Sequence, residues 1–177
     1  MKKIAGFVGK FYPPHIGHLK VVDDACEKFD KVYMIISNND IRNEQIKNLS
    51  GFDIIKPELI KMWLCDYYKD NKKVLIEIFD ETDLKPYPED QDVWADKFKQ
   101  QFPDINVKIA DESYRKFNEK FFPEYEFFSI DRDNISVHST LIRKCCVEGN
   151  VDYIKKFVLE KTYTYLKDKY KNNDITN

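Results

Sequence analysis

A chain of 177 residues is long enough for one globular domain, or for one domain with a small helical appendage. Its formal charge of −2, from 29 basic and 31 acidic residues, argues against the broad basic surface that nucleic-acid binding needs. No apolar run approaches the ~20 residues that span a bilayer, and the N-terminus does not resemble a signal peptide. We therefore expect a cytoplasmic protein that uses neither a membrane nor a nucleic acid as its partner.

Apolar runs of the β type alternate with helical patterns along the first 130 residues. Strands are predicted at 3–9, 31–37, 73–80, 105–110 and 125–130, and helices at 18–29, 57–70, 90–102 and 112–121. Beyond residue 139 the pattern is helical to about residue 171. This alternation is typical of βαβ units, which form a parallel sheet with helices on both faces. Ligands of such sheets bind beyond the carboxyl ends of the strands, where the strand order reverses.

The stretch Gly-Lys-Phe-Tyr-Pro-Pro-His-Ile-Gly-His, at residues 9–18, lies where the first predicted strand turns into a helix. Unpaired backbone N–H groups and the helix dipole attract anions at a helix N-terminus. Gly9 and Gly17 allow the backbone to approach a ligand closely, and the two prolines stiffen the turn. This stretch therefore predicts a phosphate-binding site.

Side chains in the same stretch add positive charge and hydrogen-bond donors. Two imidazoles, from His15 and His18, accompany the ammonium group of Lys10. A histidine pair at this spacing can also be a surface pair or half of a metal site. No third ligand lies nearby, since the only other histidine is His138, and the four cysteines show no metal-ligand spacing. We predict a nucleotide-phosphate site and no protein-bound metal.

The pattern Gly-x-Phe-x-Pro-x-His-x-Gly-His resembles the signature of the nucleotidyltransferase superfamily, the adenylyl- and cytidylyltransferases with a Rossmann-like fold. Class I aminoacyl-tRNA synthetases share His-x-Gly-His, but they are much longer and their Lys-Met-Ser-Lys-Ser loop is absent here. The resemblance implies an α/β fold with a central parallel sheet of about five strands, helices on both faces and a C-terminal helical extension. It implies one domain over 1–177, with a core at 1–145 and the extension at 146–177.

A second pattern, Val-His-Ser-Thr-Leu-Ile-Arg at 137–143, opens the C-terminal helical region. Ser139 or Thr140 can cap that helix, with Arg143 about one turn inside it, as in an ordinary helix start followed by a solvated arginine. The pattern also resembles the second superfamily signature, Ile-Ser-Ser-Thr-x-x-Arg, whose hydroxyls and arginine hold the β- and γ-phosphates. His138 stands where the first serine is expected, and the other three positions match.

Three further stretches are similar to nicotinamide-nucleotide adenylyltransferases of the NadR and archaeal type. Asp-Arg at 131–132 looks like the pair that precedes their second signature. Pro-Tyr-Pro at 86–88, followed by Trp94, is similar to a segment whose tryptophan stacks on the nicotinamide ring. Ser-Asn-Asn-Asp-Ile-Arg at 37–42 resembles a loop whose arginine binds the mononucleotide phosphate. Trp94 could instead be core, and Arg42 a solvated loop charge.

The resemblance implies a set of roles for named residues. The expected catalytic residues are His15, His18, Lys10 and Arg143. ATP is expected to contact Gly9, Phe11, Gly17, Asp111, Arg132, Ser139 and Thr140. The mononucleotide is expected to contact Asn38, Arg42 and Trp94.

The implied reaction is transfer of AMP from ATP to nicotinamide mononucleotide, giving NAD and pyrophosphate. Mg²⁺ would arrive bound mainly to the ATP phosphates, since no cluster of carboxylates is apparent. Flavin mononucleotide and phosphopantetheine are alternative acceptors, although phosphopantetheine enzymes usually have threonine in place of His15. A non-catalytic nucleotide sensor is an alternative from another functional class. Only the presence of His138, where the signature has a serine, favours it. The sequence is compatible with a homo-oligomer and does not decide the question.

Overall fold

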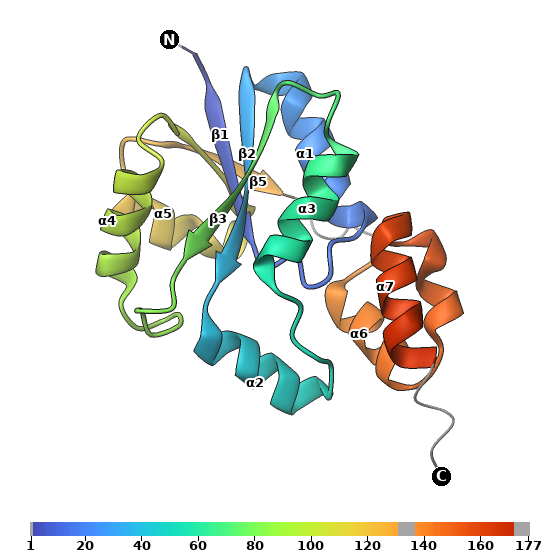
Figure 1. Ribbon diagram of the computed structural model, residues 1–177. Coiled ribbons are helices and arrows are strands. Elements are labelled where there is room, and N and C mark those ends of the chain that lie inside the picture. Colours follow the sequence, from blue (N-terminus) through green and yellow to red (C-terminus); the bar gives the residue numbers. More distant parts are fainter. Residues whose placement is uncertain (1, 131–136, 172–177) are drawn as a thin grey trace.

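A computed structural model describes residues 2–130 and 137–171 (Figure 1). Its five strands form one parallel sheet in the order β3-β2-β1-β4-β5. The strands are β1 (Ile4–Gly9), β2 (Lys31–Asn38), β3 (Val74–Asp80), β4 (Val107–Asp111) and β5 (Glu126–Ile130). Each lies within about two residues of its predicted position, because buried parallel strands read as short, continuous apolar runs. The predicted Rossmann-like fold class is confirmed.

Helices connect successive strands, as the alternating pattern predicts. They are α1 (Ile16–Lys28), α2 (Asp40–Ser50), α3 (Pro57–Tyr67), α4 (Gln91–Gln101) and α5 (Arg115–Phe121), the last preceded by a 3₁₀ turn, η1 (Glu112–Tyr114). The C-terminal region holds α6 (Ser139–Val147), a second 3₁₀ segment η3 (Val151–Lys156) and α7 (Glu160–Lys171). The predicted boundary at residue 145 falls inside α6.

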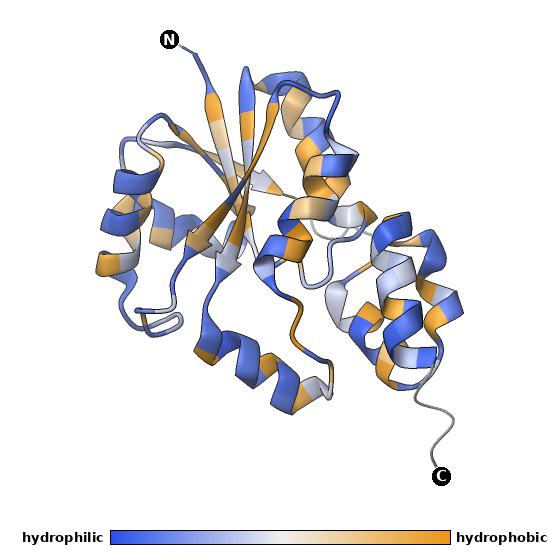
Figure 2. Ribbon diagram, viewed as in Figure 1, coloured by the Kyte–Doolittle hydropathy of each residue, from blue (hydrophilic) through white to orange (hydrophobic). Residues whose placement is uncertain are grey.

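Helix α2 corrects the expectation of an extended loop at 37–42. Asn39 caps this helix by accepting a hydrogen bond from the backbone N–H of Arg42, and Gly51 ends it in the left-handed conformation at φ 69°. Most of the helix is exposed and hydrophilic, as Figure 2 shows, so it lacks the broad apolar stripe from which an amphipathic helix is recognised. The capping residues were the available signal for it.

Two apolar clusters lie on opposite faces of the sheet. Helices α1 and α3 cover one face, and α4 and α5 cover the other (Figure 1). On β2, Met34 and Ile36 belong to the first cluster and Ile35 to the second, because side chains along a strand alternate between faces. The second cluster is rich in aromatic rings, among them Phe98 and Phe122.

The C-terminal helices pack against the α/β body. The Tyr170 hydroxyl accepts a hydrogen bond from the backbone N–H of Asp53 at 2.8 Å, and its ring stacks on Phe52. Ile16, the first residue of α1, donates its backbone N–H to the carbonyl of Phe157. The first contact joins the extension to the segment between α2 and α3, and the second joins it to the turn that carries the histidine motif. Within residues 2–130 and 137–171, every helix is too short or too polar to cross a membrane.

Candidate nucleotide-binding site

The strand order reverses between β1 and β4. The chain runs from β1 through β2 to β3 at one edge of the sheet, and then continues with β4 and β5 on the other side of β1. In sheets of this kind the crevice at the carboxyl ends of these strands receives the ligand. The histidine motif follows the carboxyl end of β1, and Asp111 is the last residue of β4. The topology therefore places both predicted elements at this crevice.

The two histidines of the motif cap helix α1 through their own side chains. His15 is the N-cap residue, and its Nδ1 accepts a hydrogen bond from the backbone N–H of Gly17 at 3.1 Å. His18 Nδ1 accepts one from the backbone N–H of His15 at 3.3 Å, and the two rings stack with centroids 3.7 Å apart. Because each Nδ1 is an acceptor, the neutral form of each ring carries its hydrogen on Nε2.

The Phe11 ring packs against the His18 ring. The Phe11 side chain is buried and meets His18 edge to face, with ring centroids 4.9 Å apart. Its backbone adopts φ 49°, which is unusual for a residue with a side chain. A Cβ atom at Gly9 would lie 3.0 Å from the Phe11 ring. Gly9 therefore makes room for the phenylalanine, which in turn fixes the histidine.

His15 is almost fully enclosed, with 3% of its surface exposed. Burial, with smaller electrostatic contributions from His138 and Arg143, lowers the pKa of His15 to about 4. In the ligand-free protein His15 is therefore a neutral imidazole at physiological pH. The model-peptide pKa of histidine is about 6.5, so enclosure places His15 well below the usual range.

Helix α6 brings the second motif against the first. Arg143 donates from Nη1 to the carbonyl of Tyr12 at 2.7 Å and from Nη2 to the Thr140 hydroxyl at 3.1 Å. The Ser139 hydroxyl donates to the carbonyl of Pro13 at 3.4 Å. Residues 126 and 131 positions apart in the sequence thus form one wall, which brings the two signatures together.

Three cations converge beside this wall. Lys10 is mostly buried, and its ammonium group donates to the carbonyl of Ser37 at 3.3 Å. Burial lowers the pKa of Lys10 to about 8, with Glu81 opposing the shift and Arg42 adding to it. Arg42 also acts on Arg143, whose pKa is lowered mainly by burial. Arg42, although exposed on the first turn of α2, therefore belongs electrostatically to the same site.

Trp94 lies on α4, within the aromatic cluster on the far face of the sheet. Its ring stacks on Phe98 at 5.3 Å and meets Phe79 edge to face. It is partly buried against this cluster, so it contributes to the core, and its contact with a mononucleotide stays a prediction. Asn38, also predicted to contact the mononucleotide, accepts a hydrogen bond from the Asn43 side chain. Arg132 lies outside the described residues.

Three polar residues near the site escaped the sequence interpretation. Asn39, beside the predicted Asn38, is buried, and its amide donates to the carbonyls of Glu81 and Leu84, so it clamps the loop after β3. Glu81 is itself buried directly after that strand. Lys108 is buried in the middle of β4. A lysine within the apolar run Val-Lys-Ile was the available signal for the last of these.

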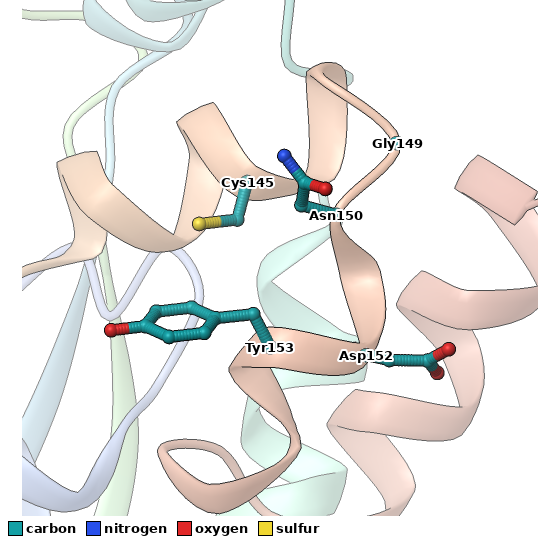
Figure 3. Close-up of a pocket in the computed structure, with 5 residues that line it drawn as sticks. All are labelled: Cys145, Gly149, Asn150, Asp152 and Tyr153. Carbon is teal, nitrogen blue, oxygen red and sulfur yellow. The ribbon is translucent and has the colours of Figure 1, made fainter.

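A hollow of about 340 Å³ lies elsewhere, on the C-terminal extension (Figure 3). Figure 3 shows Cys145 and Tyr153 on opposite sides of it, with Asp152 turned away. No residue of either motif's predicted site lines it, so it does not enter the argument for this site. Among residues 2–130 and 137–171, no group of three or more His, Cys, Asp or Glu side chains is arranged to hold a metal ion.

The sequence model of a known family, described as cytidylyltransferase-like, matches residues 6–163. The chain belongs to this family. It is 34% identical over 101 residues to the trifunctional NAD biosynthesis/regulator protein NadR of Escherichia coli, a match covering 55% of this chain and 24% of that protein. The chain thus matches about a quarter of the length of this relative.

Two further relatives carry different names. Phosphopantetheine adenylyltransferase of Pelagibacter ubique is 29% identical over 174 residues, covering 96% of this chain and 99% of that protein. A crystal structure of NadR protein in complex with NR superposes with a TM-score of 0.66 at 25% identity, covering 81% of this chain and 41% of that chain. The predicted resemblance to NadR-type nucleotidyltransferases is confirmed, and the acceptor is a separate question.

Proposed function

We propose that this protein transfers the AMP group of ATP to nicotinamide mononucleotide, forming NAD and pyrophosphate. The observation that carries the proposal is the paired orientation of His15 and His18, whose Nδ1 atoms are held by backbone N–H groups. Their Nε2 atoms then serve as two adjacent donors for phosphate oxygens. Arg42 influences the pKa of both Lys10 and Arg143, so these three cations lie within electrostatic reach of one another. Similarity to NadR proteins supports the choice of nicotinamide mononucleotide.

The reaction requires positioning and charge neutralisation more than covalent chemistry. A 5′-phosphate oxygen of the mononucleotide attacks the α-phosphorus of ATP, the bond from that phosphorus to the bridging oxygen breaks, and pyrophosphate leaves. The acceptor is already a competent nucleophile, so catalysis consists of bringing two anions together and stabilising the spreading negative charge. No side chain needs to form a covalent intermediate.

The chain's own groups divide these tasks. His15 and His18 donate hydrogen bonds to the phosphate oxygens on which negative charge grows. Lys10 and Arg143 neutralise the β- and γ-phosphates, for which the planar guanidinium is suited to two parallel contacts. Arg42 binds the acceptor phosphate, and its electrostatic influence on both Lys10 and Arg143 supports a place for that phosphate near the ATP phosphates.

Mg²⁺ enters this proposal as a companion of ATP. The groups around the histidine motif are imidazoles, an ammonium and guanidiniums, whereas Mg²⁺ prefers carboxylate, phosphate and water oxygens. These side chains do not form a cage for the ion. Mg²⁺ therefore binds through the ATP phosphates and water, and no step above depends on a residue that holds it.

The direct test measures pyrophosphate release from ATP and Mg²⁺ with nicotinamide mononucleotide, phosphopantetheine and flavin mononucleotide in parallel reactions. Release with the first, accompanied by NAD, is the expected result. Phosphopantetheine is the second candidate, favoured by the full-length similarity to the Pelagibacter enzyme. Release with phosphopantetheine alone would replace the acceptor and retain the mechanism. Nucleotide binding without release under any condition would instead indicate a sensor.

Replacing Trp94 by alanine is expected to raise the KM for nicotinamide mononucleotide by about tenfold, since aromatic stacking contributes roughly 1–3 kcal/mol per base. The KM for ATP should stay within about twofold. Because Trp94 also packs on Phe98, a Trp94→Phe variant serves as the control that keeps an aromatic ring in the cluster. Initial-rate kinetics with each substrate varied separately provide the measurement. A change in the KM for ATP alone would show that Trp94 does not bind the mononucleotide.

A further inference from the structure

Glu81 is the buried carboxylate beside the proposed site that has no part in the mechanism above. It follows the last residue of β3, and its backbone N–H donates to the carbonyl of Asn38 at 2.7 Å. Only 7% of its surface is exposed. Its own carbonyl accepts a hydrogen bond from the Asn39 side chain, so the backbone of Glu81 is held at both its N–H and its carbonyl. A buried carboxylate held this firmly calls for a partner of opposite charge.

The Glu81 side chain reaches both halves of the proposed site. Burial raises the pKa of Glu81, and the Ser37 and Trp94 side chains beside its carboxylate oppose that increase. The Glu81 Oε1 atom is buried without a hydrogen-bond partner among the described residues. Trp94 is the residue predicted to bind the mononucleotide. Ser37 is the residue whose backbone carbonyl accepts a hydrogen bond from the Lys10 ammonium group. One side chain therefore contacts the acceptor platform and the strand end that holds the ATP-side lysine.

The charges around Glu81 are mainly positive. Lys10, after β1, and Lys97, on α4, both favour its ionised form against the cost of burial. Lys108, on β4, is also influenced by the Glu81 charge. Lys10 in turn faces Arg42 and Asp40 of α2. Of the carboxylates that act on Lys10, Glu81 has the larger influence.

We propose that Glu81 is a positioning residue whose carboxylate orients the Trp94 ring and supplies the counter-charge for the Lys10 ammonium. This inference rests on the proposed function, because it assigns the two sides of Glu81 to the acceptor and to ATP. Loss of the charge alone should weaken ATP binding at alkaline pH. A substitution that removes both carboxylate oxygens of Glu81 should in addition free the Trp94 indole to change its orientation.

The sign of the pH effect follows from Lys10. Its pKa is already lowered to about 8, and the negative charge of Glu81 opposes that decrease. Removing the charge in Glu81→Gln lowers the pKa of Lys10 further, so the ammonium is lost at a lower pH. Affinity for the triphosphate then begins to fall roughly one pH unit earlier than in the wild type, which is a typical effect of one close charge.

The first experiment measures the Kd of α,β-methylene-ATP, with Mg²⁺, between about pH 6.5 and 9.5. Glu81→Gln, nearly the same shape as glutamate, is expected to bind as the wild type does near pH 6.5 and about tenfold more weakly near pH 8.5. Asp83→Asn is the matched control: it removes one negative charge two residues away, from an exposed carboxylate paired with Lys97 at 2.5 Å. Its profile should follow the wild type.

The second experiment observes the tryptophan directly. The chain has two tryptophans, so a ¹H–¹⁵N spectrum contains two indole signals, which a Trp94→Phe variant assigns. In Glu81→Ala the Trp94 signal should shift and that of Trp63, in the other cluster, should stay in place. Glu81→Gln retains one acceptor oxygen and should shift the signal less.

The outcomes separate this proposal from the proposed function. Failure of the wild type to bind the ATP analogue at any pH would overturn the proposed function. Wild-type binding together with an unchanged alkaline profile in Glu81→Gln would overturn the counter-charge role. A purely structural role would lower the melting temperature and leave that profile in place. An unmoved Trp94 signal in a folded Glu81→Ala protein would overturn the orienting role.

Discussion

Replacing His18 by alanine is expected to lower kcat by about 100-fold or more, the usual consequence of losing one donor to a charge that develops in the transition state. His18 offers Nε2 to the phosphates because its Nδ1 is engaged by the backbone N–H of His15. Its ring is held between Phe11 and His15. The donor is thus fixed in place before the substrate arrives. Steady-state kinetics with ATP and the acceptor from the parallel assay provide the measurement.

Alanine at this position also removes a helix cap, so the loss of a donor must be separated from the loss of structure. The His18→Asn variant keeps an acceptor oxygen near the Nδ1 position and has no group at Nε2. It should therefore keep the cap and still lose the same activity. His18→Gln, whose amide reaches toward Nε2, should recover part of it. The cap itself contributes about 1 kcal/mol to stability, a loss expected only in the alanine variant.

Either of two results would contradict this account of His18. One is a kcat in His18→Ala within about threefold of the wild type, which would leave no room for a donor in the transition state. The other is full activity in His18→Asn, which would assign the histidine a capping role alone. Thermal unfolding of each variant, with and without the ATP analogue, shows whether the protein remains folded and still binds nucleotide.

The strands and the crevice could be predicted from sequence because each depends on local pattern. Buried parallel strands are short apolar runs, and the position of the histidine motif after the first of them is fixed by chain order. The motif residues 9–18 therefore had to lie at the carboxyl end of β1. Helix α2 was missed because its amphipathic stripe is weak: Ile41 and Leu49 are exposed, and only its caps marked it.

The details of the site depended on contacts that no local pattern encodes. Burial is the main reason that the pKa of His15 is low, and His138 and Arg143, more than 120 positions away, lower it further. Glu81 is joined to Trp94 only after β3 and α4 have packed. Resemblance to a family pointed to motif residues such as His15 and Arg143 and passed over buried polar groups outside the motifs, such as Glu81 and Lys108.

Replacing Lys108 by methionine is expected to raise the free energy of unfolding by about 3 kcal/mol near neutral pH, since removing an enclosed charge is often stabilising by 1–4 kcal/mol. Lys108 lies across the sheet from the histidines, with its ammonium 3.6 Å from the centre of the Phe98 ring and 4.8 Å from that of Phe122. The rings attract the cation, and Glu81 adds to that attraction, yet burial dominates and lowers the pKa of Lys108 to about 7.

The pH dependence of this effect has a definite sign. In the unfolded chain the pKa of Lys108 returns to the model-peptide range near ~10.4, so between about pH 7 and 10.4 the unfolded state binds more protons than the folded state. The contribution of Lys108 should therefore make the wild type more stable as the pH rises through this window. Lys108→Met lacks the titrating group, so its advantage should be largest at and below about pH 7 and fade toward pH 10.

Urea unfolding at about pH 6.5, 8 and 9.5 measures both the size of the gain and its decline. Lys28→Met is the matched control, because Lys28 also lies over an aromatic ring, 4.3 Å from the centre of Phe128, but on an exposed part of α1. That variant should change stability by less than about 0.5 kcal/mol at every pH, as expected for an exposed cation. A large loss of stability in Lys108→Met, constant with pH, would mean that the aromatic rings and Glu81 outweigh burial. The charged lysine would then be a structural anchor for the Trp94 cluster.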